Sequence, residues 1–220
     1  MSCELMSRYF RRYWRHLSPM SVFSTYLQLG FWHIWSWQAT DHLTFLLALC
    51  APYALADWRR VVALVTSFTI GHSLTLALAT LELVGVNASV IEALIPVTIM
   101  LTALLNMGQA GRVDARFHRR PASVLWAVPN ALALTFGLIH GLGFSNYLRS
   151  LLGENSRPIA ELLSFNLGVE LGQLLVVSII LLLGFVVLRG FGATRRDWIL
   201  TTSGAALGVL LLLLVQLLAA

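Results

Sequence analysis

The chain has 220 residues, of which 58% are hydrophobic and only 11% are charged, whereas about a quarter of the residues in soluble domains are charged. This composition excludes a soluble globular protein and indicates an integral membrane protein, with room for several helices because each span takes about 20 residues. The formal net charge of +5 reflects fifteen arginines and no lysine; they lie in short connecting segments and form no stripe on a soluble face, so nucleic acid is excluded as a partner.

Residues 1–25 contain four arginines but no long apolar run, which predicts an amphipathic segment at the membrane interface. Residues 26–220 are predicted to form a single transmembrane helical domain. Its apolar windows are long enough to span a bilayer, and they cover residues 29–55, 61–83, 90–110, 124–148, 159–188 and 198–219. The expected fold is therefore an all-α integral membrane protein, a bundle of six transmembrane helices.

The connectors between these windows alternate in arginine content, with two, none, four, two and three arginines in chain order. By the positive-inside rule, the first, third and fifth connectors are predicted to lie in the cytoplasm. The same rule then places both termini outside. The four arginines between positions 8 and 15 favour the cytoplasmic side for the N-terminus, so its side is left open.

The first window contains HIWSWQATDHLTFLLAL, with His33, Asp41 and His42 ahead of a clean apolar stretch. Neighbouring residues of a helix diverge by about 100°, so Asp41 and His42 can converge only if the helix breaks or starts near Thr40. In the alternative interpretation Thr40 or Asp41 caps the following helix and His42 bonds a backbone carbonyl. The tryptophans around His33 are typical of an interfacial belt, in which a histidine has no special role.

The second window carries FTIGHSLT, which places Thr69, His72 and Ser73 inside an apolar span. The third window begins with Glu92, which either serves a site or interacts with the helix dipole in the first turn. An intramembrane histidine is often a helix-to-helix hydrogen bond, but here it is one of several such residues.

The fourth window ends in FGLIHGLGF, where Gly137, Gly141 and Gly143 surround His140. Glycines at this density predict a broken or kinked fourth helix that exposes carbonyls beside the imidazole, a device that transporters use at ion sites. The alternative is tight helix packing. A similar break in the first helix is also compatible with the Asp41–His42 pair.

The fifth window contains FNLGVELGQ. Asn166, Glu170 and Gln173 lie within roughly 60° of one another on a helix, and Gly168 and Gly172 lie on the opposite face. The glycine face predicts close packing against another helix. A carboxylate in the middle of a bilayer costs several kcal/mol unless it is paired, so Glu170 is predicted to be functional, with the two amides orienting it.

Together these side chains form a buried set of imidazole and carboxylate ligands, which suits Ni, Co, Zn or Fe(II). The candidate metal ligands are His42, His72, His140, Asp41, Glu170, Glu92 and His33. The candidate supporting residues are Asn166, Gln173, Ser73 and Thr69.

The five stretches HIW…TDHLTFLLAL, FTIGHSLTLALA, VIEALI, FGLIHGLGF and FNLGVELGQ resemble, in order, the motifs of the HupE/UreJ family of small bacterial membrane proteins. The resemblance covers about residues 30–185. It implies a multi-pass protein of the bacterial inner (plasma) membrane that acts as a nickel or cobalt permease. It also implies site roles for Asp41, His42, His72, Glu92, His140, Asn166, Glu170 and Gln173. Ala39 departs from the family pattern, which has glycine at that position.

The leading interpretation is a permease or binding protein for divalent transition-metal ions. Its partners would be the lipid bilayer and the metal ion. An intramembrane metalloenzyme, in which Zn or Fe activates water and Glu170 or Asp41 is the general base, is the alternative. A third interpretation is a metal-stabilised subunit of a larger membrane complex, with the Gly168 and Gly172 face or the last helix as an interface. A homo-oligomer or a membrane partner is also compatible with the sequence.

Overall fold

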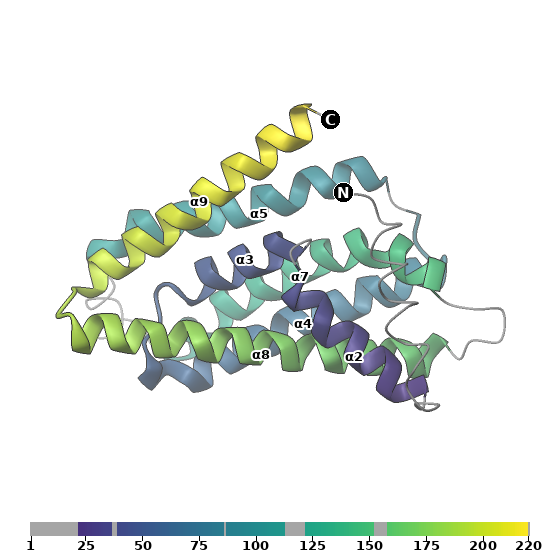
Figure 1. Ribbon diagram of the computed structural model, residues 1–220, viewed down its shortest axis with the longest axis horizontal. Helices are drawn as coiled ribbons and strands as arrows, with labels where there is room; N and C mark the ends of the chain where they lie inside the picture. Colours follow the sequence, from purple (N-terminus) through teal and green to yellow (C-terminus); the bar gives the residue numbers. More distant parts are fainter. Residues whose placement is uncertain (1–21, 37–38, 86, 113–121, 152–157, 220) are drawn as a thin grey trace.

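The computed structural model describes residues 22–36, 39–85, 87–112, 122–151 and 158–219, and within these ranges the regular structure is entirely helical (Figure 1). The α-helices are α2 (Val22–Trp35), α3 (Thr40–Cys50), α4 (Trp58–Thr80), α5 (Ala88–Gln109), α7 (Ala122–Leu151), α8 (Pro158–Gly190) and α9 (Arg195–Ala219). Two 3-10 turns, η2 (Leu55–Asp57) and η3 (Ala110–Arg112), precede α4 and follow α5. Most of the predicted interfacial segment, residues 1–21, lies outside the described residues.

Five of these helices, α4, α5, α7, α8 and α9, are long and apolar enough to cross a membrane. The expected count of six spans is not confirmed, because the first window contains two short helices. Helix α2 has 14 residues and ends at Trp35, and α3 has 11 residues and begins at Thr40. At 1.5 Å per residue α3 is only about 16 Å long, roughly half of the hydrocarbon thickness of a bilayer.

The fourth window forms one continuous helix, α7, so the predicted break in this helix is not found. Its glycines serve close packing against α4. A Cβ atom on Gly137 would collide with the carbonyl oxygen of Phe68, and one on Gly141 with that of His72. On the α4 side, a Cβ atom on Gly71 would likewise collide with the carbonyl oxygen of Leu134. The glycines therefore let the backbones of α4 and α7 touch. This contact sets side by side the two helices that carry His72 and His140.

The glycine face of α8 also packs as predicted. Gly168 lies against the carbonyl oxygen of Leu27 and Gly30 against that of Phe165, so α2 and α8 approach through one glycine from each helix. Gly172 continues this face, since a Cβ there would lie 3.0 Å from the carbonyl oxygen of Phe31. This contact explains how the short helix α2 is held along α8.

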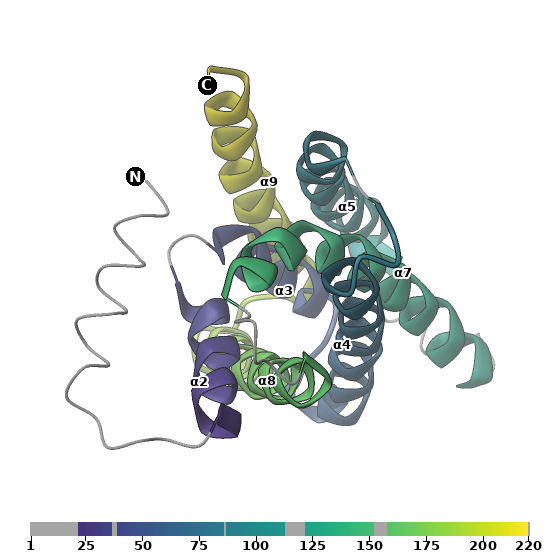
Figure 2. The ribbon, with the colours of Figure 1, turned by 90° about the vertical axis from the view of Figure 1, so that its right-hand side faces the viewer.

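Helix α3 lies inside the bundle, as the end-on view shows (Figure 2). It packs against α5, α8 and α9, while α9 runs beside α5 on one flank of the molecule. Two apolar clusters meet around α3. One gathers buried residues of α2, α4 and α8, including Ile34 and Phe165, and the other includes Phe45 and Phe68. The first turn of α3 therefore reaches the interior between the two clusters.

The arginine-rich connectors gather at one end of the bundle. Asp57, before α4, lies 3.4 Å from Arg195 at the start of α9 and 3.7 Å from Arg60. Ala110, just after α5, packs against Ile199 of α9. The first and fifth connectors and the beginning of the third thus share one end, which we call the Asp57 end. This arrangement agrees with the alternation of arginine along the chain; the side of the membrane stays a prediction.

Candidate metal centre

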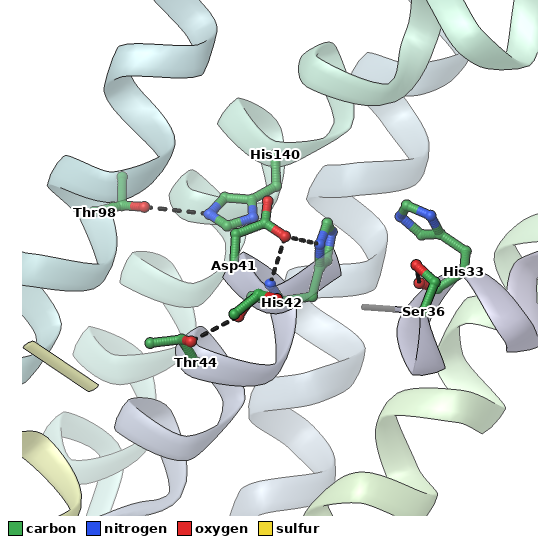
Figure 3. Close-up of polar contacts among 8 residues, drawn as sticks. His33, Ser36, Asp41, His42, Thr44, Thr98 and His140 are labelled. Carbon is green, nitrogen blue, oxygen red and sulfur yellow. Dashed lines mark hydrogen bonds and ion pairs between the residues drawn. The ribbon is translucent and has the colours of Figure 1, made fainter. Parts of the chain in front are cut away.

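Asp41 and His42 both lie in the first turn of α3, and Asp41 folds back onto its neighbour (Figure 3). Its Oδ1 accepts hydrogen bonds from the backbone N–H of His42, at 2.9 Å, and from Nδ1 of the same residue, at 3.0 Å. The His42 side chain is 6% exposed and that of Asp41 25%. The Asp41–His42 contact depends on the start of α3 at Thr40. In the first turn of a helix the Asp41 carboxylate can turn toward the His42 imidazole although the two residues do not share a helix face.

His140 of α7 completes a compact group with this pair. One possible ligand atom from each of Asp41, His42 and His140 lies within 4.8 Å of the other two. Figure 3 shows the Asp41 carboxylate beside the His140 ring. Groups of this kind, with three or more histidine, cysteine or acidic residues close enough to hold a metal ion, were found in the described residues only here.

Two further imidazoles surround this group. The ring centroid of His72, on α4, lies 6.3 Å from that of His42. The ring of His33, in the last turn of α2, lies 5.0 Å from the His42 ring. We refer to Asp41, His42, His72 and His140 as the histidine centre. His33 lies at its edge, so the imidazoles come from α2, α3, α4 and α7.

A hydrogen bond to Asn166 of α8 orients the His72 ring. The amide nitrogen of Asn166 donates to the carbonyl of Leu162 at 2.8 Å, so its Oδ1 faces His72 Nδ1 at 3.4 Å. An oxygen in that position accepts, and the proton of the neutral ring is therefore assigned to Nδ1. The other ring nitrogen, Nε2, is left with a lone pair.

Thr98 of α5 does the same for His140. The Thr98 hydroxyl donates its one proton to the carbonyl of Ile95 at 2.7 Å, so at its 3.2 Å contact with His140 Nε2 it must accept. The His140 proton is thereby assigned to Nε2, and Nδ1 keeps its lone pair. Outer partners of this kind fix the tautomer of metal-binding histidines in many proteins.

The nitrogens left by these bonds are buried and have no hydrogen-bond partner within the described chain; they are His42 Nε2, His72 Nε2 and His140 Nδ1, with His33 Nε2 beside them. An unsatisfied buried polar atom costs about 1–3 kcal/mol, and several in one place fit a site for a cation that accepts nitrogen lone pairs. Three imidazoles and a carboxylate suit Ni, Co, Zn or Fe(II).

Aromatic side chains enclose the imidazoles. The His140 ring lies 5.3 Å from the rings of both Phe45 and Phe68. On the other side, the His33 ring lies 4.1 Å from that of Phe144. These rings keep the surroundings of the histidine centre apolar, which strengthens the electrostatic attraction between a bound cation and Asp41.

The remaining candidate residues lie outside the histidine centre. Glu92 is exposed on α5. Glu170 is half-buried on α8, and its Oε1 accepts a hydrogen bond from Thr66 at 2.8 Å. Ser73 is half-buried on α4. Thr69 and Gln173 contact each other at 2.9 Å, between α4 and α8.

Sequence reasoning missed two threonines, Thr98 and Thr66. A signal for Thr66 exists, because Thr66, Thr69 and His72 are spaced by three residues and so follow one side of α4. For Thr98 we find no such signal, since its role depends on the contact between α5 and α7.

Replacing Thr98 by valine should lower the affinity for a divalent probe such as Ni²⁺ by about tenfold, because loss of an outer partner of a metal-binding histidine costs 10–100-fold. Equilibrium dialysis on the purified protein measures this. Thr102→Val is the matched control, since among the described residues the Thr102 hydroxyl bonds only the Thr98 carbonyl of its own helix, at 2.8 Å. Equal affinity of both variants would contradict the role of Thr98.

The chain was also compared with protein families, curated proteins and solved structures. Residues 11–217 match the family model described as HupE / UreJ protein. The chain matches no curated protein and no solved structure at a significant level. Because the match covers nearly the whole chain and includes every residue of the histidine centre, this protein belongs to the HupE/UreJ family.

Proposed function

We propose that this protein is a membrane permease for divalent transition-metal cations of the nickel and cobalt type. The observation that carries the proposal is the set of buried, unpartnered imidazole nitrogens on His42, His72 and His140 beside the Asp41 carboxylate. Membership of the HupE/UreJ family supports the same class of cation.

The position of the histidine centre between two short helices favours passage over permanent storage. His33 lies in the last turn of α2 and His42 in the first turn of α3, so the centre lies where the two short helices meet. In transporters, discontinuous helices of this kind bring backbone groups and helix ends to a site deep in the membrane. The cation can then leave when the two short helices shift, without unfolding a full span.

The charge of the histidine centre also favours reversible binding. Asp41 offsets only one of the two positive charges of the cation, and neutral imidazoles offset none. The net positive charge that remains in a low-dielectric interior costs free energy. This cost weakens binding and so assists release, whereas a structural metal site is usually closed and tightly bound.

Purified protein in lipid vesicles tests the proposal. We expect Ni²⁺ and Co²⁺ to bind reversibly and to accumulate inside the vesicles, with no competition from Mg²⁺ or Ca²⁺, which prefer oxygen ligands. Tightly held, non-exchanging metal without uptake would instead support the intramembrane enzyme or the metal-stabilised subunit. Absence of both binding and uptake of Ni²⁺ and Co²⁺ would refute the permease.

A further inference from the structure

A line of polar contacts leaves the histidine centre along the interface between α4 and α8. It consists of three pairs, which we call the polar seam: His72 with Asn166 at 3.4 Å, Thr69 with Gln173 at 2.9 Å, and Thr66 with Glu170 at 2.8 Å. Each pair joins one residue of α4 to one of α8. Polar residues inside membrane helices are costly and usually mark an ion pathway.

The seam has a direction. Thr66 precedes His72 by six residues on α4, so the pair with Glu170 lies about 9 Å nearer the start of α4. That start is the Asp57 end, where Arg60 and Arg195 also lie. The Thr66–Glu170 pair is half-buried, whereas both residues of each of the other two pairs are buried. The seam thus leads from the closed interior toward a more accessible carboxylate.

The pair of Thr69 and Gln173 contains a polar group that has no partner within the described chain. The Gln173 side chain is 0% exposed, and its Nε2 has no hydrogen-bond partner within the described chain. Thr69 lies 3.0 Å from the Val65 carbonyl and 2.9 Å from Gln173 Oε1, but its hydroxyl has only one proton to donate. If the Gln173 amide turns over, its nitrogen donates to Thr69 and its oxygen becomes available to a cation.

We propose that Glu170, Thr66 and Gln173 form a second cation site, which the ion occupies after it leaves the histidine centre toward the Asp57 end. This inference rests on the proposed permease function. Carboxylate, hydroxyl and amide oxygens bind a nickel-type cation more weakly than imidazoles do. A weaker site, nearer to solvent and with its own negative charge, gives the ion an intermediate position after it leaves the histidine centre and then releases it.

The test compares Glu170→Gln with the wild type in two assays, using Ni²⁺ alone as the probe. In equilibrium dialysis, the variant should keep the tight binding step of the histidine centre and lose only a weaker step. In vesicles, its Ni²⁺ uptake should fall by about tenfold or more, which corresponds to a change of 1.4 kcal/mol or more in the transfer step. Glu170→Asp, which keeps the carboxylate, should restore part of the uptake.

Ser178→Ala is the matched control on the same helix, because the Ser178 hydroxyl is exposed and bonds the Leu174 carbonyl at 2.7 Å; it should leave uptake unchanged. Retained tight binding also reports that Glu170→Gln is folded. If this variant does not fold, Thr66→Val serves instead and should lower uptake in the same direction by a smaller factor.

The outcomes separate the two proposals. Loss of the tight step in Glu170→Gln would place Glu170 in the histidine centre and overturn the second site, leaving the permease function intact. Wild-type uptake by Glu170→Gln would also overturn the second site alone. A wild-type protein that neither binds nor transports Ni²⁺ would refute the permease function, and the second site with it.

Discussion

Replacing His42 by glutamine is expected to weaken Ni²⁺ binding by about 100-fold or more, the upper end of what loss of even an outer partner costs. His42 is the middle of the histidine centre: its ring lies 5.4 Å from that of His140 and 6.3 Å from that of His72. The substitution removes one imidazole and also leaves the Asp41 carboxylate without the Nδ1 donor that holds it at 3.0 Å. Calorimetric titration of purified protein measures the change.

Glutamine is chosen because it keeps volume and polarity near those of histidine and so limits the cavity that alanine would create. Thr44→Val is the control on the same helix. Thr44 is buried, but its hydroxyl donates to the Thr40 carbonyl at 2.6 Å, so this variant should bind Ni²⁺ as the wild type does. If His42→Gln bound Ni²⁺ with wild-type affinity, the histidine centre would not be the binding site.

Five spans could be predicted from the sequence because each has a long apolar run, most of them set off by Arg, Pro, Gly or polar clusters, as in α5 and α8. The division of the first window could not be predicted with certainty. Residues 29–55 are apolar enough on average for one span, but α2 ends at Trp35 and a new helix begins at Thr40. Hydropathy averaged over a window does not detect a turn of a few residues, and here that turn places Asp41 and His42 in the interior.

The histidine centre and the polar seam show a second limit of sequence reasoning. Helical periodicity correctly placed Asn166, Glu170 and Gln173 on one face of α8, but it gives only the direction around the helix axis. How far along the neighbouring helix each side chain lies depends on how α8 is set against α4. Asn166 meets His72, whereas Glu170, one turn later, meets Thr66. A shared face therefore did not mean a shared site.

The glycines of α7 show the same limit. FGLIHGLGF predicted either a break or close packing, and both follow from the absence of a Cβ atom. The choice depends on whether another helix lies against the glycines. Here α4 does, with the carbonyls of Phe68 and His72 against Gly137 and Gly141.

Gly137→Ala is expected to destabilise the fold by about 2 kcal/mol, a typical cost of overpacking a close contact, and to lower Ni²⁺ affinity at the same time. The added methyl group would meet the Phe68 carbonyl carbon at 2.9 Å and the His72 backbone nitrogen at 3.0 Å, and these backbone atoms cannot move without shifting α4. Thermal unfolding in detergent, followed by Ni²⁺ titration of the folded protein, measures both effects.

Gly208→Ala is the same substitution at another position, and it is expected to have the opposite effect on stability. Gly208 lies inside α9, and a Cβ atom there would meet nothing within 4 Å. Alanine should therefore stabilise the protein by about 0.5–1 kcal/mol, because glycine in a helix interior loses more conformational entropy on folding. If both variants had the same effect, the α4–α7 contact would not depend on Gly137. Opposite effects on stability, with Ni²⁺ affinity lowered in Gly137→Ala and unchanged in Gly208→Ala, would show that the approach of these two backbones, which carry His72 and His140, sets the spacing of the histidine centre.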